Sequence, residues 1–287
     1  MARVKGGLVI LKEMINNLPP SERKIANYIL NNPEESILLT ALKLGEKSQT
    51  SSAAVIRLCK SLGFSGFQEL KIRVAGDLQA DDITEYRDIE PNESYKAIID
   101  KVTSNTIQTL RETVDIMSEK NIKKAVSALS NAKSVIFIGV GASYIAAVDA
   151  EQKLLRINKN AHSFSDVHMA ATSIANKGPE DVVVGISFSG NTQEVAKLME
   201  LAKHKKVKTI SITKYGNSLV SNFSDIQLHT SAAKEATFRS GATSSRIAQL
   251  HLIDILLMCL ASEEYDETIK HLDETREAVS FLRGNKN

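Results

Sequence analysis

Three hydroxyl side chains and a glycine gather in the segment Ile186-Ser187-Phe188-Ser189-Gly190-Asn191-Thr192. The segment follows a run of β-branched residues and precedes a helical pattern, so we place it at a strand-to-helix junction. A helix N-terminus offers free N–H groups and a positive dipole end, and both suit a phosphate dianion. Local helix capping could explain any one of these residues alone, but their clustering favours a phosphate site. The residues expected to bind the phosphate ester are Ser187, Ser189, Gly190, Asn191 and Thr192. No lysine is present in the segment, which excludes a nucleotide P-loop.

A second junction of the same kind occurs at Gly139-Val140-Gly141-Ala142-Ser143. The third glycine of a dinucleotide-binding fingerprint is replaced here by Tyr144, which is too bulky for the close helix packing that such a site needs. We therefore expect no nicotinamide cofactor, and no other cofactor is expected. Gly141 and Ser143 are instead expected to face a bound sugar from a neighbouring strand end.

A third informative segment, residues 44–62, reads LGEKSQTSSAAVIRLCKSL. A short helix to about Ser48, a turn at Gln49-Thr50 and a helix capped by Ser51 would form a helix-turn-helix. In the second helix an inward stripe of Ala54, Val55, Leu58 and Leu62 is expected. The residues left to contact DNA are Ser51, Ser52, Ala53, Ile56, Arg57 and Lys60. A plain helical hairpin has the same spacing, and from the spacing alone the two interpretations are equally good.

The elements around these segments divide the chain into two parts. Residues 8–79 show only helical periodicity, and the acidic, proline-containing stretch 80–93 is typical of a linker. Two amphipathic helices are predicted near 94–117 and 119–130. The predicted domains are therefore 1–79 and 94–287, joined by the linker 80–93.

Beyond residue 134, short apolar runs alternate with helical segments. The predicted strands are 134–140, 181–187, 208–213 and 225–228. The predicted helices are 143–157, 166–176, 191–204 and 240–261. This alternation indicates a parallel sheet covered on both faces, with the ligand crevice at the carboxyl ends of the strands.

The charge of the chain is uneven, although its net value over 287 residues is only +2. Residues 1–80 contain eleven Lys and Arg against seven Asp and Glu, which hints weakly at a polyanion partner. The two cysteines, Cys59 and Cys259, lie in apolar helical patterns and are expected to be reduced core residues. The apolar stretch 252–261 is too short to span a bilayer and contains Asp254. We therefore expect a soluble cytoplasmic protein with no membrane partner.

The N-terminal residues resemble the helix-turn-helix domain of the RpiR family of bacterial regulators. The matching segments are LPPSERKIA at 18–26, SAAVIRLCKSLGF at 52–64 and GFQELK at 66–71. The resemblance implies that the helix from Ser51 is the recognition helix. Gln49-Thr50 departs from the family pattern, in which the turn carries Gly followed by an apolar residue, so a strained turn is expected there.

Residues 120–262 resemble the SIS (sugar isomerase) domain. The matching motifs are the two junctions above and, further on, Glu235 with Arg239-Ser240-Gly241-Ala242. The resemblance implies a five-stranded parallel sheet in a three-layer α/β domain, preceded by an all-α helix-turn-helix domain. It also implies a phosphosugar held by Ser143, Ser187, Ser189 and Thr192, with Glu235 at its hydroxyl groups.

Glu235 leaves an enzymatic alternative open. Isomerases of this fold use a glutamate as general base and often a histidine to open the ring, and His162, His229 and His251 are present. A sensor would use Glu235 only to hydrogen-bond the sugar. The DNA-reading segment 51–60 favours the sensor, since a phosphosugar isomerase or lyase has no use for it. No catalytic residues are therefore predicted, and no metal-ligand spacing is seen.

Together the two resemblances predict a transcription regulator of sugar or amino-sugar catabolism genes. Double-stranded operator DNA would be bound by a homodimer or homotetramer, and a phosphorylated sugar would control the affinity. The chain is most similar to RpiR-type regulators of the MurR kind. That similarity implies N-acetylmuramic acid 6-phosphate as the first effector candidate and N-acetylglucosamine 6-phosphate as the second.

Overall fold

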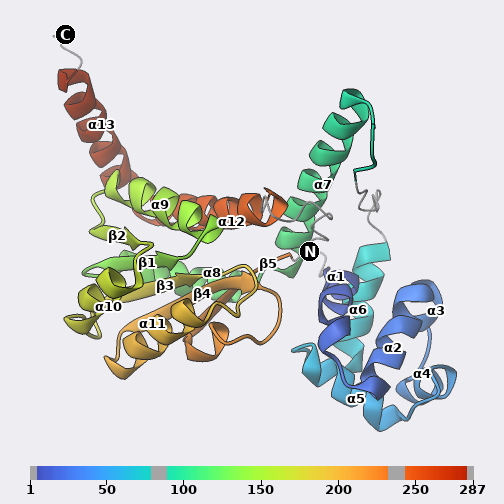
Figure 1. Ribbon diagram of the computed structural model, residues 1–287. Coiled ribbons are helices and arrows are strands. Elements are labelled where there is room, and N and C mark those ends of the chain that lie inside the picture. Colours follow the sequence, from blue (N-terminus) through green and yellow to red (C-terminus); the bar gives the residue numbers. More distant parts are fainter. Residues whose placement is uncertain (1–4, 79–88, 232–242, 283–287) are drawn as a thin grey trace. The chain divides into compact units, whose positions relative to one another are not determined.

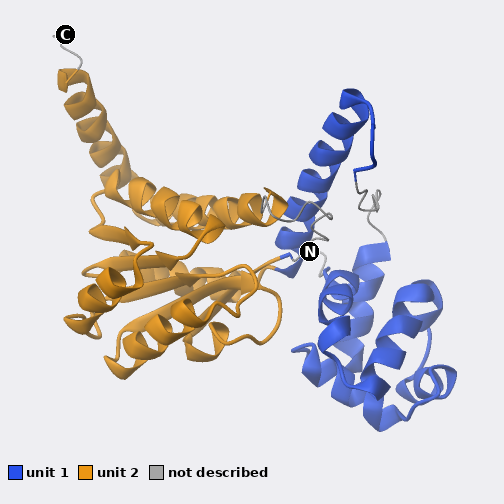
Figure 2. Ribbon diagram, viewed as in Figure 1, with its two compact units in different colours: residues 1–116, 231–238 blue, residues 117–230, 239–287 orange. Residues whose placement is uncertain are grey.

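The computed structural model describes residues 5–78, 89–231 and 243–282. The chain divides into two compact units (Figure 2). The first comprises residues 1–116 with 231–238, and the second comprises residues 117–230 with 239–287.

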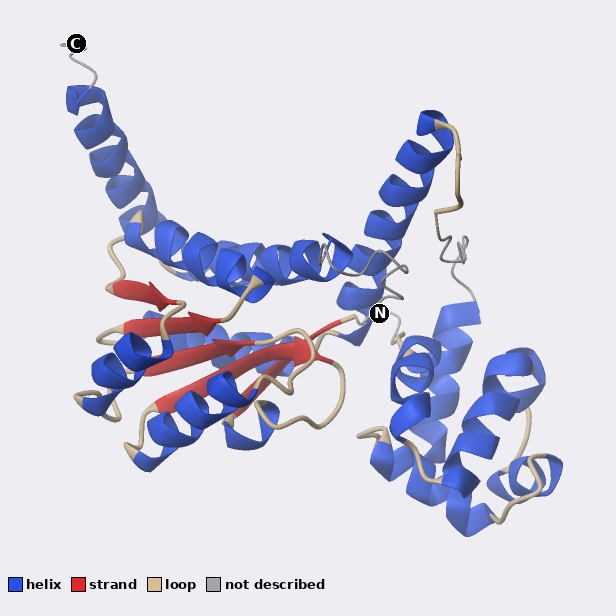
Figure 3. Ribbon diagram, in the orientation of Figure 1, coloured by secondary structure: helices blue, strands red, loops and turns tan. Residues whose placement is uncertain are grey.

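The described part of the first unit is helical (Figure 3). Its elements are α1 (Gly7–Met14), η1 (Ile15–Asn17), α2 (Pro20–Asn31), α3 (Pro33–Ser36), α4 (Ala41–Lys47), α5 (Ser52–Ser61), α6 (Phe67–Leu78) and α7 (Tyr95–Ile116). Pro20 occupies the first turn of α2, where its missing N–H costs nothing, and Pro33 begins α3 directly after α2. α5 packs against both α2 and α4. Fully buried side chains of these helices form the core, among them Ile25, Ile29, Leu44, Leu58 and Leu62.

The second unit is built on a five-stranded parallel sheet of order β2-β1-β3-β4-β5 (Figure 1). Its strands are β1 (Val135–Gly139), β2 (Ala161–Phe164), β3 (Val182–Ile186), β4 (Lys208–Lys214) and β5 (Ile226–Thr230). Its helices are α8 (Glu119–Ser130), α9 (Ala142–Leu155), α10 (Val167–Ala175), α11 (Gln193–His204), η2 (Ser221–Phe223), α12 (Thr243–Glu263) and α13 (Tyr265–Leu282).

Helices cover both faces of this sheet, as parallel sheets require. One face of the strands shares a core with α8, α9 and α12, and the other shares a core with α10 and α11. Successive residues of β1 alternate between the two cores: Val135 and Phe137 lie in the first, Ile136 and Ile138 in the second. The sequence therefore has a nearly continuous apolar run in each central strand.

Within the described residues, α12 is long and apolar enough to cross a membrane by length and composition. Its apolar side chains Leu252, Ile253, Leu256 and Leu260 are buried in the first core. The apolar character of this helix is thus explained by its packing against the sheet.

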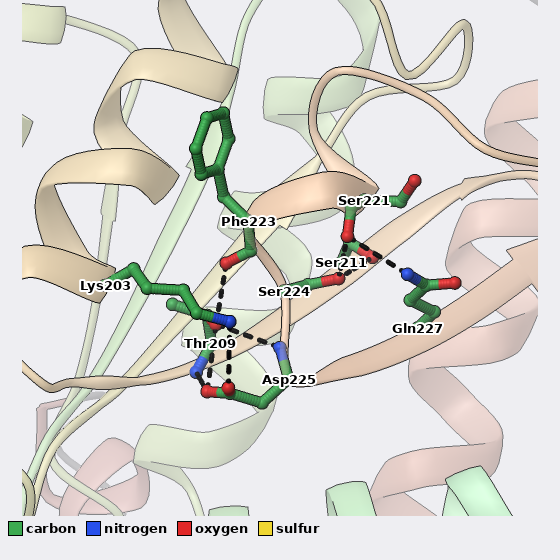
Figure 4. Close-up of polar contacts among 8 residues, drawn as sticks. All are labelled: Lys203, Thr209, Ser211, Ser221, Phe223, Ser224, Asp225 and Gln227. Carbon is green, nitrogen blue, oxygen red and sulfur yellow. Dashed lines mark hydrogen bonds and ion pairs between the residues drawn. The ribbon is translucent and has the colours of Figure 1, made fainter.

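A polar network joins the amino ends of β4 and β5, which lie opposite the carboxyl ends of the strands (Figure 4). The Asp225 carboxylate accepts a 3.0 Å hydrogen bond from the Thr209 amide and pairs with the Lys203 ammonium at 3.2 Å. The Thr209 hydroxyl has one proton to donate and lies within reach of two acceptors, the Asp225 carboxylate at 3.0 Å and the Phe223 carbonyl at 2.9 Å. Burial raises the pKa of Asp225, but the Thr209 amide, Lys203 and the Thr209 hydroxyl together hold it below its usual value. The network is structural, because it joins the start of β4 to the residue before β5 through contacts among the protein's own groups.

The predicted fold class is confirmed, including the helical N-terminal part and the five-stranded parallel sheet. All predicted helices and four strands occur near their predicted positions, but β2 did not stand out in the sequence. Its residues Ala161–Phe164 include His162 and Ser163, which break the apolar run, because β2 lies at the edge of the sheet. The predicted domain limits remain predictions. Residues 79–88 of the linker lie outside the described part, and the compact units group α7 with the N-terminal helices.

Candidate functional site

The loops after β1 and β3 flank the point where the strand order of the sheet reverses. β1 pairs with β2 on one side and with β3 on the other, and Gly139 at the end of β1 stands opposite Ile186 at the end of β3. From these ends α9 and α11 leave toward opposite faces of the sheet. Ligands of open parallel α/β sheets bind at such a switch point. The two segments predicted to hold a phosphosugar are therefore brought side by side.

The loop after β3 carries hydroxyl groups bonded to one another. The hydroxyls of Ser187 and Thr192 lie 2.8 Å apart, so one donates to the other and one proton of the pair remains available. The Ser189 hydroxyl accepts a hydrogen bond of 3.1 Å from the Asn191 amide, which leaves its own proton to donate. Ser187 is buried, Ser189 and Thr192 are half-buried, and Asn191 is exposed. The loop therefore offers donors to a ligand without carrying a charge.

Gly190 cannot be replaced by a larger residue in this loop. Its φ is +70°, in the left-handed region, and a Cβ there would collide with the Ser218 side chain. Its carbonyl accepts a 2.9 Å hydrogen bond from the Val220 amide. Gly190 thus fixes the loop after β3 against the segment that follows β4.

The start of α11 has unused hydrogen-bond donors. Thr192 is the N-cap residue, yet its side chain does not cap the helix. The first amide of α11 that donates a backbone hydrogen bond is that of Ala196, which donates to the Thr192 carbonyl at 3.0 Å. The amides of residues 193–195 are the unpaired donors typical of a helix start. They lie next to the hydroxyl pair and could bind a phosphate together with it.

The two residues of the β1–α9 segment that were predicted to face the sugar, Gly141 and Ser143, differ in their exposure. Gly141, with a φ of +59°, is the exposed N-cap of α9. Ser143 is buried, and its hydroxyl accepts a 3.2 Å hydrogen bond from the Gln249 amide group of α12. Gln249, only 1% exposed, therefore orients the Ser143 hydroxyl. The sequence did carry a signal for Gln249, since it is a polar residue on the buried face of an apolar helix.

Aromatic and basic groups gather where β4 and β5 end. The Lys214 amide donates to the Phe188 carbonyl at 2.9 Å, which joins β4 to the hydroxyl-bearing loop. The rings of Tyr215 and His229 lie 4.9 Å apart. Burial lowers the pKa of His229, against the raising effect of its hydrogen bonds to the Lys214 and Thr213 backbone. Burial thus favours the neutral form of His229.

Glu235 and the motif Arg239-Ser240-Gly241-Ala242 lie outside the described residues. Ser218 is a site residue that the sequence analysis missed. It follows β4 and became relevant only through its contact with Gly190, which lies 28 positions earlier in the chain. No local pattern marks such a contact.

In the first unit, α4, a short turn and α5 form the helix-turn-helix that the sequence predicted. Gln49 in the turn has a φ of +54°, the left-handed conformation expected there. The Thr50 amide donates to the Gly45 carbonyl at 2.7 Å, and a Cβ on Gly45 would lie 2.8 Å from the Ser51 carbonyl carbon. Gly45 thus permits the close approach of the two helices. The Ser51 hydroxyl caps α5 by accepting from the Ala54 amide at 3.2 Å.

The predicted DNA-contacting side chains share one face of α5. The opposite stripe, Ala54, Val55, Leu58 and Leu62, is buried as predicted, and Cys59 is buried with it. Ser51, Ala53, Ile56, Arg57 and Lys60 are exposed, and Ser52 is half-buried. Small residues at the start of the helix and two cations further along suit a helix that enters the major groove.

Two family models match the chain. The model described as "Helix-turn-helix domain, rpiR family" matches residues 5–81, and the model described as "SIS domain" matches residues 128–259. The first match includes α5, and the second includes the loops after β1 and β3.

Two relatives and one solved structure illustrate how closely known proteins match over nearly the whole chain. The HTH-type transcriptional regulator YbbH of Bacillus subtilis is 48% identical over 278 residues, which are 97% of this chain and 98% of that protein. The regulator HexR of Pseudomonas aeruginosa is 29% identical and covers 96% of both chains. The structure of Vibrio vulnificus NanR "complexed with ManNAc-6P" is similar with a TM-score of 0.61 and 29% identity, covering 96% of this chain and 99% of that chain.

Proposed function

Because this chain belongs to the RpiR family of transcriptional regulators, with a helix-turn-helix domain and an SIS domain, we propose that a phosphorylated sugar bound at the switch point controls its affinity for operator DNA. The observation that carries the proposal is the pairing of two sites in one chain. One is the exposed face of α5 in the helix-turn-helix, and the other is a pair of strand-end loops that carry uncharged hydrogen-bond donors.

The exposed face of α5 supports the DNA-binding half of the proposal. Phosphate contacts position a protein on DNA, and side chains at base edges read the sequence. Ser51, Ser52, Ala53 and Ile56 would approach the bases, and Arg57 and Lys60 would reach bases or phosphates. Two protomers would present two such helices to half-sites one helical turn apart, ~34 Å, or a multiple of that distance.

The loops after β1 and β3 support the ligand-binding half. The hydroxyls of Ser187, Ser189 and Thr192, the backbone at Gly190 and Asn191, and the start of α11 would bind the phosphate. Gly141 and Ser143 would face the sugar from the neighbouring strand, and Glu235 would bond its hydroxyl groups.

An amino-sugar 6-phosphate is the proposed effector class. The NanR structure was determined with ManNAc-6P, and NanR resembles this chain over nearly its full length. N-acetylmuramic acid 6-phosphate and N-acetylglucosamine 6-phosphate share with that ligand an N-acetylated, phosphorylated hexose. We place the protein in the cytoplasm, where such phosphates and the DNA are found together, and assign it no catalytic turnover.

A thermal-shift screen tests the ligand half directly. A ligand that binds only the folded protein raises the unfolding temperature, by an amount equivalent to about 2.7 kcal/mol at a concentration 100 times its Kd. We expect one or more amino-sugar 6-phosphates to raise it and the unphosphorylated sugars to leave it unchanged. A shift equal for both would contradict a phosphate-binding loop, and conversion of the ligand into product would contradict a pure sensor.

A further inference from the structure

A buried carboxylate lies behind the DNA-facing side of α5. Glu22 belongs to the first turn of α2 and is only 4% exposed. Its Oε1 lies 4.0 Å from Nε of Arg57, and Arg57 is its only ion-pair partner in the described part of the chain. Its Oε2 is buried with no hydrogen-bond partner among the described residues. A buried carboxylate with so few partners requires an explanation, because burial disfavours the charged group.

Stability does not explain this pair. The Arg57 side chain is 57% exposed. The distance of 4.0 Å between its Nε and the Glu22 Oε1 is the longest that still counts as an ion pair, and it is too long for a hydrogen bond. An exposed arginine so loosely paired stabilises a fold little. An amide or apolar residue at position 22 would avoid the cost of desolvating a carboxylate.

The surroundings of Arg57 indicate what the pair does instead. Arg57 lines a hollow of about 220 Å³ between the start of α2 and the turn before α5, together with Ser21, Lys24, Gln49, Thr50 and Ser51. The lining carries two cations and several hydroxyls, and none of its residues is acidic. The guanidinium therefore has a buried anion on one side and an open, donor-rich space on the other.

We propose that Glu22 is a positioning residue for DNA binding: it holds the Arg57 guanidinium over this hollow, where Arg57 contacts the DNA. The proposal rests on the proposed DNA-binding function of α5. The contact with Glu22 is made only through Nε of Arg57, so the other N–H groups of the guanidinium can bond to DNA. At the same time, the attraction to Glu22 limits the positions that the Arg57 side chain can take. A guanidinium held in this way loses less conformational freedom on binding.

The direction in which Glu22→Gln changes the DNA affinity distinguishes a positioning role of Glu22 from simple charge repulsion. Removing an acidic group near a polyanion strengthens DNA binding if only its charge matters. A positioning role predicts the opposite result for Glu22→Gln, which removes the charge and leaves the shape nearly unchanged.

The test is a double-mutant cycle on the full-length protein, with Glu22→Gln, Arg57→Ala and the double variant. The probe is a duplex that the wild-type protein selects from a random-sequence pool. We expect Glu22→Gln to weaken binding about tenfold in the wild-type background and to have no further effect when Arg57 is already Ala. Glu69→Gln is the matched control, since Glu69 forms its ion pair with Arg73 of the same helix α6, at 3.1 Å, and not with Arg57; it should bind like the wild type.

Each other outcome overturns the proposal. Tighter or unchanged binding by Glu22→Gln would mean that Glu22 acts only as a repelling charge or not at all. Equal losses in both backgrounds would mean that Glu22 only supports the fold. If Glu22→Gln unfolds, Glu22→Asp withdraws the carboxylate by one methylene while retaining its charge, and it must show the same dependence on Arg57. A wild-type protein that selects no sequence would overturn the DNA-binding function itself, which is a different result from an altered cycle.

Discussion

At the scale of single residues, the loop after β3 offers a ligand hydrogen-bond donors and no charged side chain. Ser187, Ser189 and Thr192 are already linked to neighbours in the loop, and each such link fixes the direction of a hydroxyl. A phosphate bound there would meet donors that need little reordering, which favours affinity.

Ser189→Ala is the most direct residue-scale test of this loop. Loss of one hydrogen bond to a charged group costs about 1.5–3 kcal/mol, so sugar-phosphate affinity should fall about 10- to 150-fold, with DNA affinity unchanged. Thr172→Ala removes an exposed hydroxyl of α10, bonded to the His168 carbonyl, and serves as the control. Calorimetric titration measures both; equal affinity in Ser189→Ala and wild type would show that the loop does not hold the phosphate.

His229 makes stability depend on pH. Its pKa is lowered in the folded state by burial, so the unfolded state binds more protons between the folded pKa and the ordinary value of 6.5. The stability due to neutral His229 is present above pH 6.5 and is lost as the pH falls through the folded pKa. The unfolding temperature should therefore decrease below pH 6.5, and less steeply in His229→Gln. Identical slopes in the two proteins would exclude this contribution.

At the scale of elements, α4 and α5 depend on a close approach at Gly45. Gly45→Ala places a Cβ 2.8 Å from the Ser51 carbonyl carbon, so the two helices must separate. We expect a loss of about 1–3 kcal/mol in the free energy of unfolding of the first unit and weaker DNA binding, with ligand binding retained. Gly66→Ala is the control, because nothing lies within 4 Å of a Cβ there, and its effect should stay within about 0.5 kcal/mol. Chemical denaturation of both variants measures the difference; equal stabilities would refute the packing argument.

The elements were predictable from the sequence wherever one face is buried or a turn has fixed chemistry. The apolar periodicity of α5, its cap at Ser51 and the left-handed residue Gln49 are all local signals. β2 was not predictable in this way, because this edge strand has only four residues, of which His162 is exposed and only Ala161 is fully buried, so it lacks an apolar run. The contacts of Ser143 with Gln249 and of Gly190 with Ser218 join distant segments, and a sequence pattern cannot show which segments meet.

At the scale of the whole molecule, the two candidate sites lie in different compact units, and the chain passes between these units three times, after residues 116, 230 and 238. A ligand alters DNA affinity only if it binds two arrangements of the protein unequally. The expected coupling of ~1–3 kcal/mol corresponds to a change of about 5- to 150-fold in operator affinity.

The assembly is also testable at this scale. If a symmetric dimer binds DNA, the selected duplex should contain two inverted half-sites whose centres lie about 10–10.5 base pairs apart, or a multiple of that spacing. Footprinting together with sedimentation of the complex measures both spacing and stoichiometry. A single half-site bound by one protomer would contradict the symmetric arrangement.

The central claim, that a phosphosugar at the switch point controls DNA binding, is tested most directly by one titration. Operator affinity is measured with and without the sugar phosphate that gives the largest thermal shift, in the wild type and in Ser189→Ala. We predict a change of about 5- to 150-fold in the wild type at saturating ligand, and Ser189→Ala should need a ligand concentration about 10- to 150-fold higher to reach the same change. An operator affinity that stays the same while the ligand is bound would contradict the account.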